Sequence, residues 1–176
     1  MISVNNSEIP VAVTDAKRWW RREVRKALKE TSEEYRKDAS DRIRERFLGL
    51  EEYRSAKTIL AYWSVGTEVD TTIMIERMLA DGKRVCLPVC TDLDEEGRRN
   101  MEAQGMEARL IADTESLEEG AYGIPEPSAD DPVILPEEID LVMLPCMTCD
   151  AKCRRLGHGG GYYDRYLPKC SRAYFA

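Results

Sequence analysis

The sequence predicts a single-domain α/β fold, a three-layer structure in which helices flank a mainly parallel central sheet. Residues 57–65 and 83–89 are rich in β-branched and aromatic residues, and a segment with helical periodicity separates them. A strand–helix–strand unit of about thirty residues joins two parallel strands through a crossover. Residues 139–144 form an almost uninterrupted apolar run, which is typical of a strand covered on both faces.

Length and composition fit one folded domain over residues 1–176, with a flexible start of about twelve residues. The chain is 43% hydrophobic and 34% charged, which argues against disorder. Its 26 basic and 33 acidic residues give a net charge of −7, which argues against sequence-independent nucleic-acid binding. No run approaches the ~18 apolar residues of a membrane helix, and no secretory leader is recognisable. We therefore predict a cytoplasmic monomer without nucleic-acid or membrane partners.

Two helices are expected before the first strand. The first is capped by Thr14 or Asp15, and its apolar residues recur at helical spacing. Seven basic residues accompany one acidic residue, Glu23, between residues 17 and 29. Such a charge run is either a solvated face or a surface that meets an anion. A capping box, with Thr31 as the cap and Glu34 three residues later, begins the second helix.

The later elements follow similar signals. Asp70 or Thr71 caps a helix that ends at Gly82. The Pro/Gly-rich residues 120–132 cannot hold a helix and predict a loop. The other expected elements are a strand over 106–112, a short helix around 162–167 and a strand over 171–175.

A glycine cluster that follows the apolar strand is the segment most informative about function. Residues 154–164 have the sequence RRLGHGGGYYD. Open α/β sheets bind ligands at the carboxyl ends of their strands, and glycines let backbone N–H groups approach a ligand closely. Arg154, Arg155 and the start of the following helix add positive charge. The segment is suited to holding phosphates, although no Gly-Lys-Ser/Thr follows as in a Walker motif.

This segment resembles the signature of the 5-formyltetrahydrofolate cyclo-ligase family, also called 5,10-methenyltetrahydrofolate synthetase. Three more of the family's motifs occur in order, at residues 17–21, 61–71 and 123–127. The resemblance implies an ATP- and Mg²⁺-dependent enzyme whose small-molecule substrates are 5-formyltetrahydrofolate and ATP. ATP would phosphorylate the formyl oxygen, N10 would attack the activated carbon, and 5,10-methenyltetrahydrofolate, ADP and phosphate would result.

The resemblance also implies roles for individual residues. The implied ATP-binding residues are Lys17, Arg18, Trp19, Trp20, Arg21, Arg155, Leu156, Gly157, His158, Gly159, Gly160, Gly161, Tyr162 and Tyr163. Two of these, His158 and Tyr163, are also implied as catalytic. The implied substrate-binding residues are Trp63, Glu68, Met106 and Tyr122. Asp164 is the implied Mg²⁺ ligand, because this hard ion prefers oxygen.

The chain departs from the family pattern at three places. His158 stands where the family commonly has Arg, and an imidazole is a cation only when it is protonated. Residues 146–149 carry two cysteines where small and aromatic apolar residues are usual. The family continues beyond the position of Ala176 with a strand and a segment that helps complete the metal site, so weaker metal binding is expected.

Two alternative functions stay open from the sequence. One is a non-catalytic homologue that binds folate or nucleotide without turnover, which His158 and the position of Ala176 favour. The other is a zinc or thiol module built from Cys146, Cys149, Cys153 and Cys170. Structural zinc sites usually consist of two short CxxC-like pairs, whereas here the fourth cysteine lies beyond a predicted helix.

Overall fold

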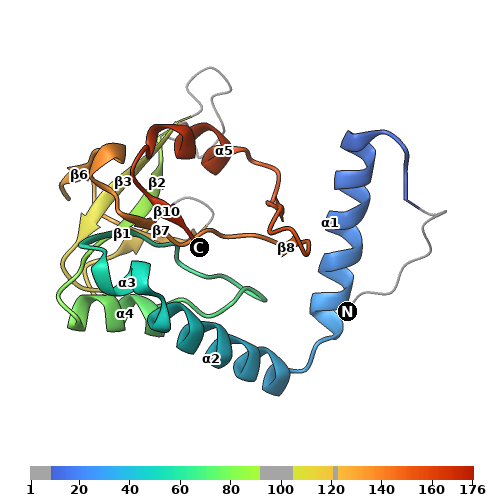
Figure 1. Ribbon diagram of the computed structural model, residues 1–176, viewed down its shortest axis with the longest axis horizontal. Coiled ribbons are helices and arrows are strands. Elements are labelled where there is room, and N and C mark those ends of the chain that lie inside the picture. The colour runs from blue at the N-terminus through green and yellow to red at the C-terminus, as the bar shows by residue number, and fades with distance from the viewer. Residues whose placement is uncertain (1–8, 92–104, 121–122) are drawn as a thin grey trace.

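A six-stranded sheet in the order β10–β7–β1–β2–β3–β6 forms the centre of the computed structural model, which describes residues 9–91, 105–120 and 123–176 (Figure 1). Its neighbouring parallel strands are β10 (Tyr174–Phe175), β7 (Leu141–Val142), β1 (Thr58–Leu60) and β2 (Arg84–Cys90). Two strands extend the sheet by antiparallel pairing, β3 (Met106–Ile111) on β2 and β6 (Val133–Ile134) on β3. The predicted mainly parallel sheet is confirmed, and the antiparallel edge is a feature that the sequence signals did not reveal.

Helices lie on both faces of this sheet (Figure 1). One face is covered by α2 (Glu33–Gly49), α3 (Glu51–Ser55) and α4 (Thr72–Ala80), and the other by α5 (Tyr162–Tyr166) with the 3₁₀ turns η3 (Pro136–Glu138) and η4 (Leu167–Lys169). Successive strand residues point to opposite faces. Accordingly, Ile59 packs with Phe47 and Met74 in one core cluster, whereas Leu60 packs with Tyr166 in the other.

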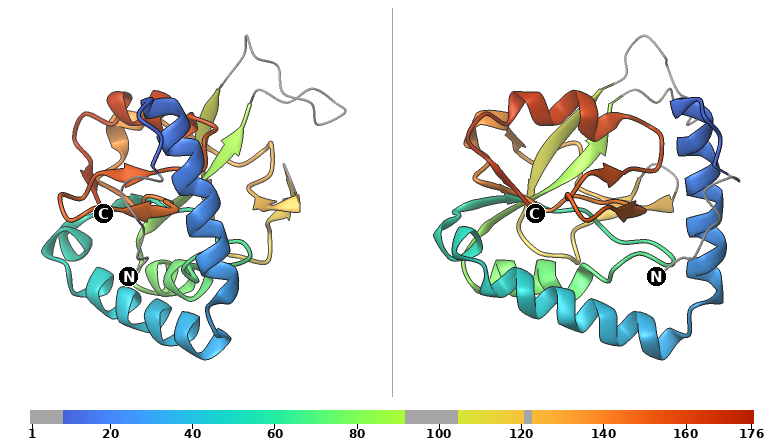
Figure 2. Two further views of the ribbon diagram at one scale, coloured as in Figure 1. Left: turned by 90° about the vertical axis from the view of Figure 1, so that its right-hand side faces the viewer. Right: turned by 45° about the vertical axis from the view of Figure 1, so that its right-hand side comes forward.

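The first helix, α1 (Val13–Glu30), stands outside these layers, as the right-hand view of Figure 2 shows. Val24 is its buried residue, so most of the helix surface meets solvent. Within the described ranges, no helix is both long enough and apolar enough to cross a membrane.

The predicted caps of the first two helices were wrong in detail. Ala12 is the N-cap residue of α1, so Thr14 and Asp15 lie inside the first turn. Ser32, not Thr31, caps α2, and its Oγ accepts the backbone N–H of Tyr35 at 3.2 Å. The Thr31 hydroxyl instead donates to carbonyl oxygens in the last turn of α1, which removes it from the capping box.

Several strands are shorter than the apolar runs that predicted them. β1 ends at Leu60 although the predicted strand continued to residue 65, and β7 holds two of the six residues from 139 to 144. The predicted loop 120–132 contains β5 (Pro125–Glu126), which pairs with β4 (Glu118–Glu119). A second hairpin joins β8 (Thr148–Cys149) to β9 (Arg155–Leu156). Some of the residues that follow these short strands, such as Tyr62, Trp63 and Pro145, line the site described below.

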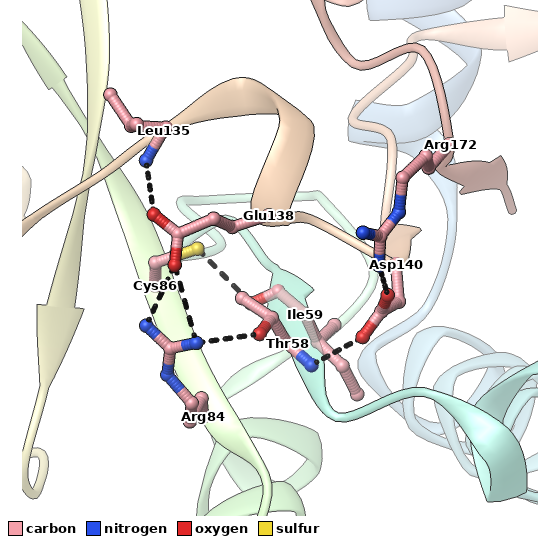
Figure 3. Close-up of polar contacts among 8 residues, drawn as sticks. All are labelled: Thr58, Ile59, Arg84, Cys86, Leu135, Glu138, Asp140 and Arg172. Carbon is pink, nitrogen blue, oxygen red and sulfur yellow. Dashed lines mark hydrogen bonds and ion pairs between the residues drawn. The ribbon is translucent and has the colours of Figure 1, made fainter.

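A carboxylate ties together the starts of the parallel strands. One oxygen of Asp140 accepts the backbone N–H groups of Lys57 and Thr58 at 2.9 and 3.0 Å, and the other accepts from Arg172 at 3.0 Å. Figure 3 shows the contacts of Asp140 with Thr58 and Arg172. Burial acts to raise the pKa of Asp140, but the hydrogen bonds from Thr58, Lys57 and Arg172 outweigh it and hold the pKa below its usual range. The ionised carboxylate therefore stabilises the folded state.

Replacing Asp140 with Asn is expected to lower the free energy of unfolding by about 1–3 kcal/mol at pH 7. Because the folded-state pKa is lowered, the contribution of Asp140 to stability is complete above the ordinary carboxyl pKa and is lost as the pH falls through the lowered folded-state pKa. In urea unfolding below and above pH ~4, the free energy of unfolding of Asp140→Asn should therefore fall less with decreasing pH than that of the starting protein. The exposed loop residue Asp130 provides the control Asp130→Asn. Identical pH profiles for the two variants would contradict this role.

Candidate functional site

A cavity of about 480 Å³ lies between α1, the segments that follow β1 and β7, and the β5 hairpin. The residues that follow β1 contribute one wall, and the glycine segment contributes the wall nearest α1. Most residues to which the sequence assigned a site role line this cavity, although they come from distant parts of the chain.

Cations from α1 and from the glycine segment meet at one end of the cavity. Lys17 and Arg21 line it, because residues four apart share one face of a helix. Arg21 Nε donates to the carbonyl oxygen of Gly157 at 2.9 Å, which joins α1 to the glycine segment. Arg155 lines the same region.

The structure does not bring the middle of the basic motif to the cavity. Arg18 is paired with Asp15 at 3.3 Å and is largely exposed. Trp19 and Trp20 pack edge to face against each other, with ring centroids 5.0 Å apart. None of these three residues lines the cavity.

Two glycines of the segment adopt backbone conformations that other residues rarely accept. Gly159 has φ +111° and Gly161 has φ +72°. A Cβ on Gly159 would lie 3.5 Å from Cζ of Arg21, which is an ordinary contact distance, so the positive φ and not a lack of space requires glycine there. The following helix, α5, has five residues. The positive charge expected from its start is therefore small, and the side-chain cations dominate this end of the site.

The implied phosphate ligand and the implied metal ligand are paired with each other. Arg155 Nη2 donates to Asp164 Oδ1 at 2.6 Å, and Arg155 Nη1 donates to the carbonyl oxygen of Pro145 at 3.3 Å. The side chain of Asp164 is 78% exposed, so solvent and ligands can reach its carboxylate. Both residues line the cavity.

His158 contacts the residue that the sequence assigned to folate. His158 Nε2 lies 3.0 Å from Glu68 Oε1, and Glu68 Oε2 accepts the backbone N–H of Val65 at 2.9 Å. His158 thus links the glycine segment to the loop after β1. The sequence resemblance gave both residues separate roles and contained no signal for their pairing.

Other residues that line the cavity are apolar. Trp63 and Met106, both predicted to bind substrate, line it with Leu87 and Pro88 of β2. The remaining predicted substrate residue, Tyr122, lies outside the described residues. This wall offers the flat apolar surface that an aromatic ring system needs.

Tyr163 places a phenol at the boundary between the cavity and the core. Its hydroxyl is buried and accepts or donates no hydrogen bond within the described part of the chain. Burial is the main cause that raises the pKa of Tyr163 above its ordinary value, and the nearby Tyr62 is the second. Arg155 acts in the opposite direction but does not outweigh them. The phenol therefore remains protonated and can act as a hydrogen-bond donor, not as a base.

The cysteines do not form a metal centre in the described part of the chain. Cys146, Cys149 and Cys153 are exposed, whereas Cys170 is buried beside Tyr166 in the core. Within the described ranges, no group of three or more His, Cys, Asp and Glu side chains is placed to hold a metal ion. The zinc alternative thus has no support in these residues.

The fold and the site define an α/β protein in which a cationic glycine-rich segment adjoins an apolar pocket, an arrangement suited to an anionic ligand beside a flat one. A sequence model described as the 5-formyltetrahydrofolate cyclo-ligase family matches residues 13–175. The chain belongs to this family. The predicted family and fold class are confirmed.

Individual relatives agree with this assignment. The chain is 34% identical to a probable 5-formyltetrahydrofolate cyclo-ligase of Schizosaccharomyces pombe, over 68% of this chain and 56% of that protein. It is 31% identical to the 5-formyltetrahydrofolate cyclo-ligase of Haemophilus influenzae, over 84% of this chain and 75% of that protein. The NMR structure of 5,10-methenyltetrahydrofolate synthetase from Aquifex aeolicus superposes with a TM-score of 0.71 and 28% identity, covering 87% of this chain and 72% of that one.

The pairing of His158 with Glu68 predicts that their substitutions will not be additive. His158→Gln and Glu68→Gln should each raise KM for the folate, and the double variant should lose less than the product of the two effects. A coupling of about 0.5–1 kcal/mol in the double-mutant cycle is expected. Steady-state kinetics of the four proteins measures it. Multiplicative effects would mean that the two side chains act independently.

Proposed function

We propose that this chain catalyses the ATP-dependent cyclisation of 5-formyltetrahydrofolate to 5,10-methenyltetrahydrofolate, with release of ADP and phosphate. The observation that carries the proposal is the cavity itself, in which Lys17, Arg21 and Arg155 adjoin an apolar wall. The cations suit the triphosphate of ATP, and the apolar wall suits a pterin ring. The family assignment supports the same reaction.

The cations hold the triphosphate in this proposal. Lys17 and Arg21 approach from α1, and Arg155 approaches from the glycine segment. The backbone N–H groups of residues 157–161 add donors that glycines leave accessible. Phosphoryl transfer depends mainly on positioning and on charge neutralisation, so this set of groups is sufficient without a covalent intermediate on the protein.

The folate occupies the apolar part. Trp63 and Met106 pack against the pterin ring, and the proposal retains Tyr122 as a third contact. Glu68 hydrogen-bonds the substrate from a position fixed by Val65 and His158. This arrangement orients the formyl oxygen toward the cationic end, where ATP is bound.

Two steps complete the proposed reaction. The formyl oxygen on N5 attacks the γ-phosphorus, the bond to the β–γ bridging oxygen breaks, and ADP leaves. N10 then attacks the activated carbon, the carbon–oxygen bond breaks, inorganic phosphate departs and N10 loses its proton. Holding the folate beside the triphosphate makes the first step effectively intramolecular, and in the second step N10 already belongs to the molecule that it attacks.

The residues present fit a Mg²⁺ ion bound partly by the nucleotide. Mg²⁺ typically takes one or two carboxylates together with substrate phosphates, and Asp164 supplies an accessible carboxylate beside Arg155. When bound there, the ion would neutralise phosphate charge. We propose that ATP binding releases Arg155 from Asp164, since the phosphates can replace this carboxylate as the partner of the guanidinium.

Tyr163 is proposed to donate its hydroxyl hydrogen to a substrate oxygen. The group remains protonated at neutral pH, and a buried phenol without a partner gains a hydrogen bond when an acceptor arrives. His158 is proposed to act beside it by holding Glu68. The proposal also retains a single domain over residues 1–176, a cytoplasmic location, a monomeric state and the absence of nucleic-acid and membrane partners.

Substitution of Tyr163 by Phe separates this role from packing. The variant removes an oxygen that has no partner in the ligand-free fold, so its thermal midpoint should equal or exceed that of the starting protein. Its kcat should fall by about 10- to 100-fold, because a donor to the reacting oxygen is lost. Unchanged kcat would show that the hydroxyl does not meet the substrate. Tyr166→Phe, which removes another unpartnered buried hydroxyl, is the matched control.

The direct test of the proposed function is turnover of the purified protein. With 5-formyltetrahydrofolate, ATP and Mg²⁺, we expect the absorbance of methenyltetrahydrofolate to rise and one ADP to appear for each ring closed. Omission of nucleotide or metal should abolish both signals. ATP hydrolysis that ignores the folate, or ring closure without nucleotide, would contradict the proposal. Ligand binding without turnover would favour the non-catalytic homologue.

A further inference from the structure

Thr71 is a buried polar residue whose hydroxyl bonds the loop after β1. The residue is fully buried at the N-cap position of α4, where a threonine hydroxyl ordinarily accepts a backbone N–H of the first helical turn. In the described helix, this hydroxyl makes no such bond. It donates instead to the carbonyl oxygen of Tyr62 at 2.6 Å and accepts the backbone N–H of Ser64 at 3.0 Å. The hydroxyl hydrogen and one of its two acceptor sites are therefore committed to the loop.

Ser64 returns the contact. Its Oγ accepts the backbone N–H of Thr71 at 3.1 Å, so the two residues form a reciprocal pair of side-chain-to-backbone hydrogen bonds. Between them, Glu68 closes a smaller turn: its backbone N–H donates to the carbonyl oxygen of Val65 at 3.2 Å, and its carboxylate accepts the Val65 N–H at 2.9 Å. Residues 64–71 thus form a closed loop whose ends are joined at Ser64 and Thr71.

The base of this loop is attached to two helices. Ser40 of α2, which is itself buried, accepts the backbone N–H of Asp70 at 3.1 Å through its Oγ. Asp70 Oδ1 accepts the backbone N–H and the hydroxyl of Thr72 at 3.0 and 2.7 Å, so this side chain bonds the start of α4 in place of Thr71. The carbonyl oxygen of Thr71 accepts the N–H of Ile75 at 2.9 Å. The first turn of α4 therefore holds Thr71 while the Thr71 side chain holds the loop.

Trp63 lies between the two residues that the Thr71 hydroxyl bonds, and it lines the cavity. β1 ends at Leu60, so strand pairing does not extend to Trp63. Tyr62 and Trp63 are partly buried and pack against the core. A backbone group that loses its partner in such a place costs free energy. The backbone on both sides of Trp63 is therefore most stable where Thr71 pairs it.

We propose that Thr71 is a positioning residue for the folate, because it fixes the backbone on both sides of Trp63 and closes the loop that carries Glu68. The inference rests on the proposed function and adds to it a residue that does not itself line the cavity. A loop that is ordered before the substrate arrives lowers the cost of binding. Thr71 should therefore affect the folate more than ATP, whose proposed cations come from α1 and the glycine segment.

Three variants separate positioning from stability. Thr71→Val keeps the shape but loses both hydroxyl bonds, so KM for 5-formyltetrahydrofolate should rise about tenfold, with kcat and KM for ATP changed by about twofold at most. Thr71→Ser keeps the hydroxyl and loses a buried methyl group, so its thermal midpoint should fall while KM for the folate stays within about twofold. Thr58→Val is the matched control, since it removes another buried threonine hydroxyl, which accepts from Arg84 at 3.3 Å within the sheet, and it should leave KM unchanged. A folate KM that follows the thermal midpoint across the three variants would overturn the inference.

The fluorescence of Trp63 gives a readout that needs no turnover. The chain has three tryptophans, so Trp19→Phe combined with Trp20→Phe leaves Trp63 alone. In this background, Thr71→Val should raise the acrylamide quenching constant about twofold, whereas Thr58→Val should not change it. Unchanged quenching in Thr71→Val would overturn the inference even in an active enzyme. If the unaltered protein shows no turnover, the proposed function fails, and the quenching still decides whether Thr71 holds the loop.

Discussion

The hydrogen bond from Arg21 to the carbonyl oxygen of Gly157 joins two parts of the chain that are 136 residues apart, and the site depends on this junction. α1 stands outside the helical layers and buries Val24, so the core of the sheet does not hold the helix in place (Figure 2). The bond brings Lys17 and Arg21 to the glycine segment, where both residues line the cavity. A chain with a net charge of −7 can thereby gather several cations at one end of a single cavity.

The carboxylates of the cavity show how this positive charge is balanced before ligands arrive. Arg155 is paired with Asp164, and His158 is paired with Glu68. An ion pair with one exposed partner contributes little net stability, and the side chain of Asp164 is 78% exposed. Under the proposed function, phosphates replace Asp164 as the partner of Arg155 at little cost, whereas His158 continues to hold Glu68.

Sequence signals predicted the parts of this structure that depend on local pattern. The helices, the parallel βαβ unit and the buried strand at residues 139–144 follow from periodicity and apolar runs, and the glycine segment follows from composition. The resemblance located Lys17, Glu68 and Asp164 in what became one cavity. Pairings such as that of His158 with Glu68 depend on how distant segments pack in the fold, so the spacing of residues along the sequence does not predict them. The bonds from Thr71 to the loop after β1 were hidden for the same reason, since a threonine before a helix is ordinarily explained as its cap.

The central claim is that the cavity brings the formyl oxygen of the folate to the γ-phosphate of ATP. The most direct measurement follows that oxygen. When 5-formyltetrahydrofolate carrying ¹⁸O in its formyl group is converted in the presence of ATP and Mg²⁺, the account predicts one ¹⁸O atom in each inorganic phosphate released, detected by mass spectrometry. Inorganic phosphate without the label, with ¹⁸O released as water, would contradict it.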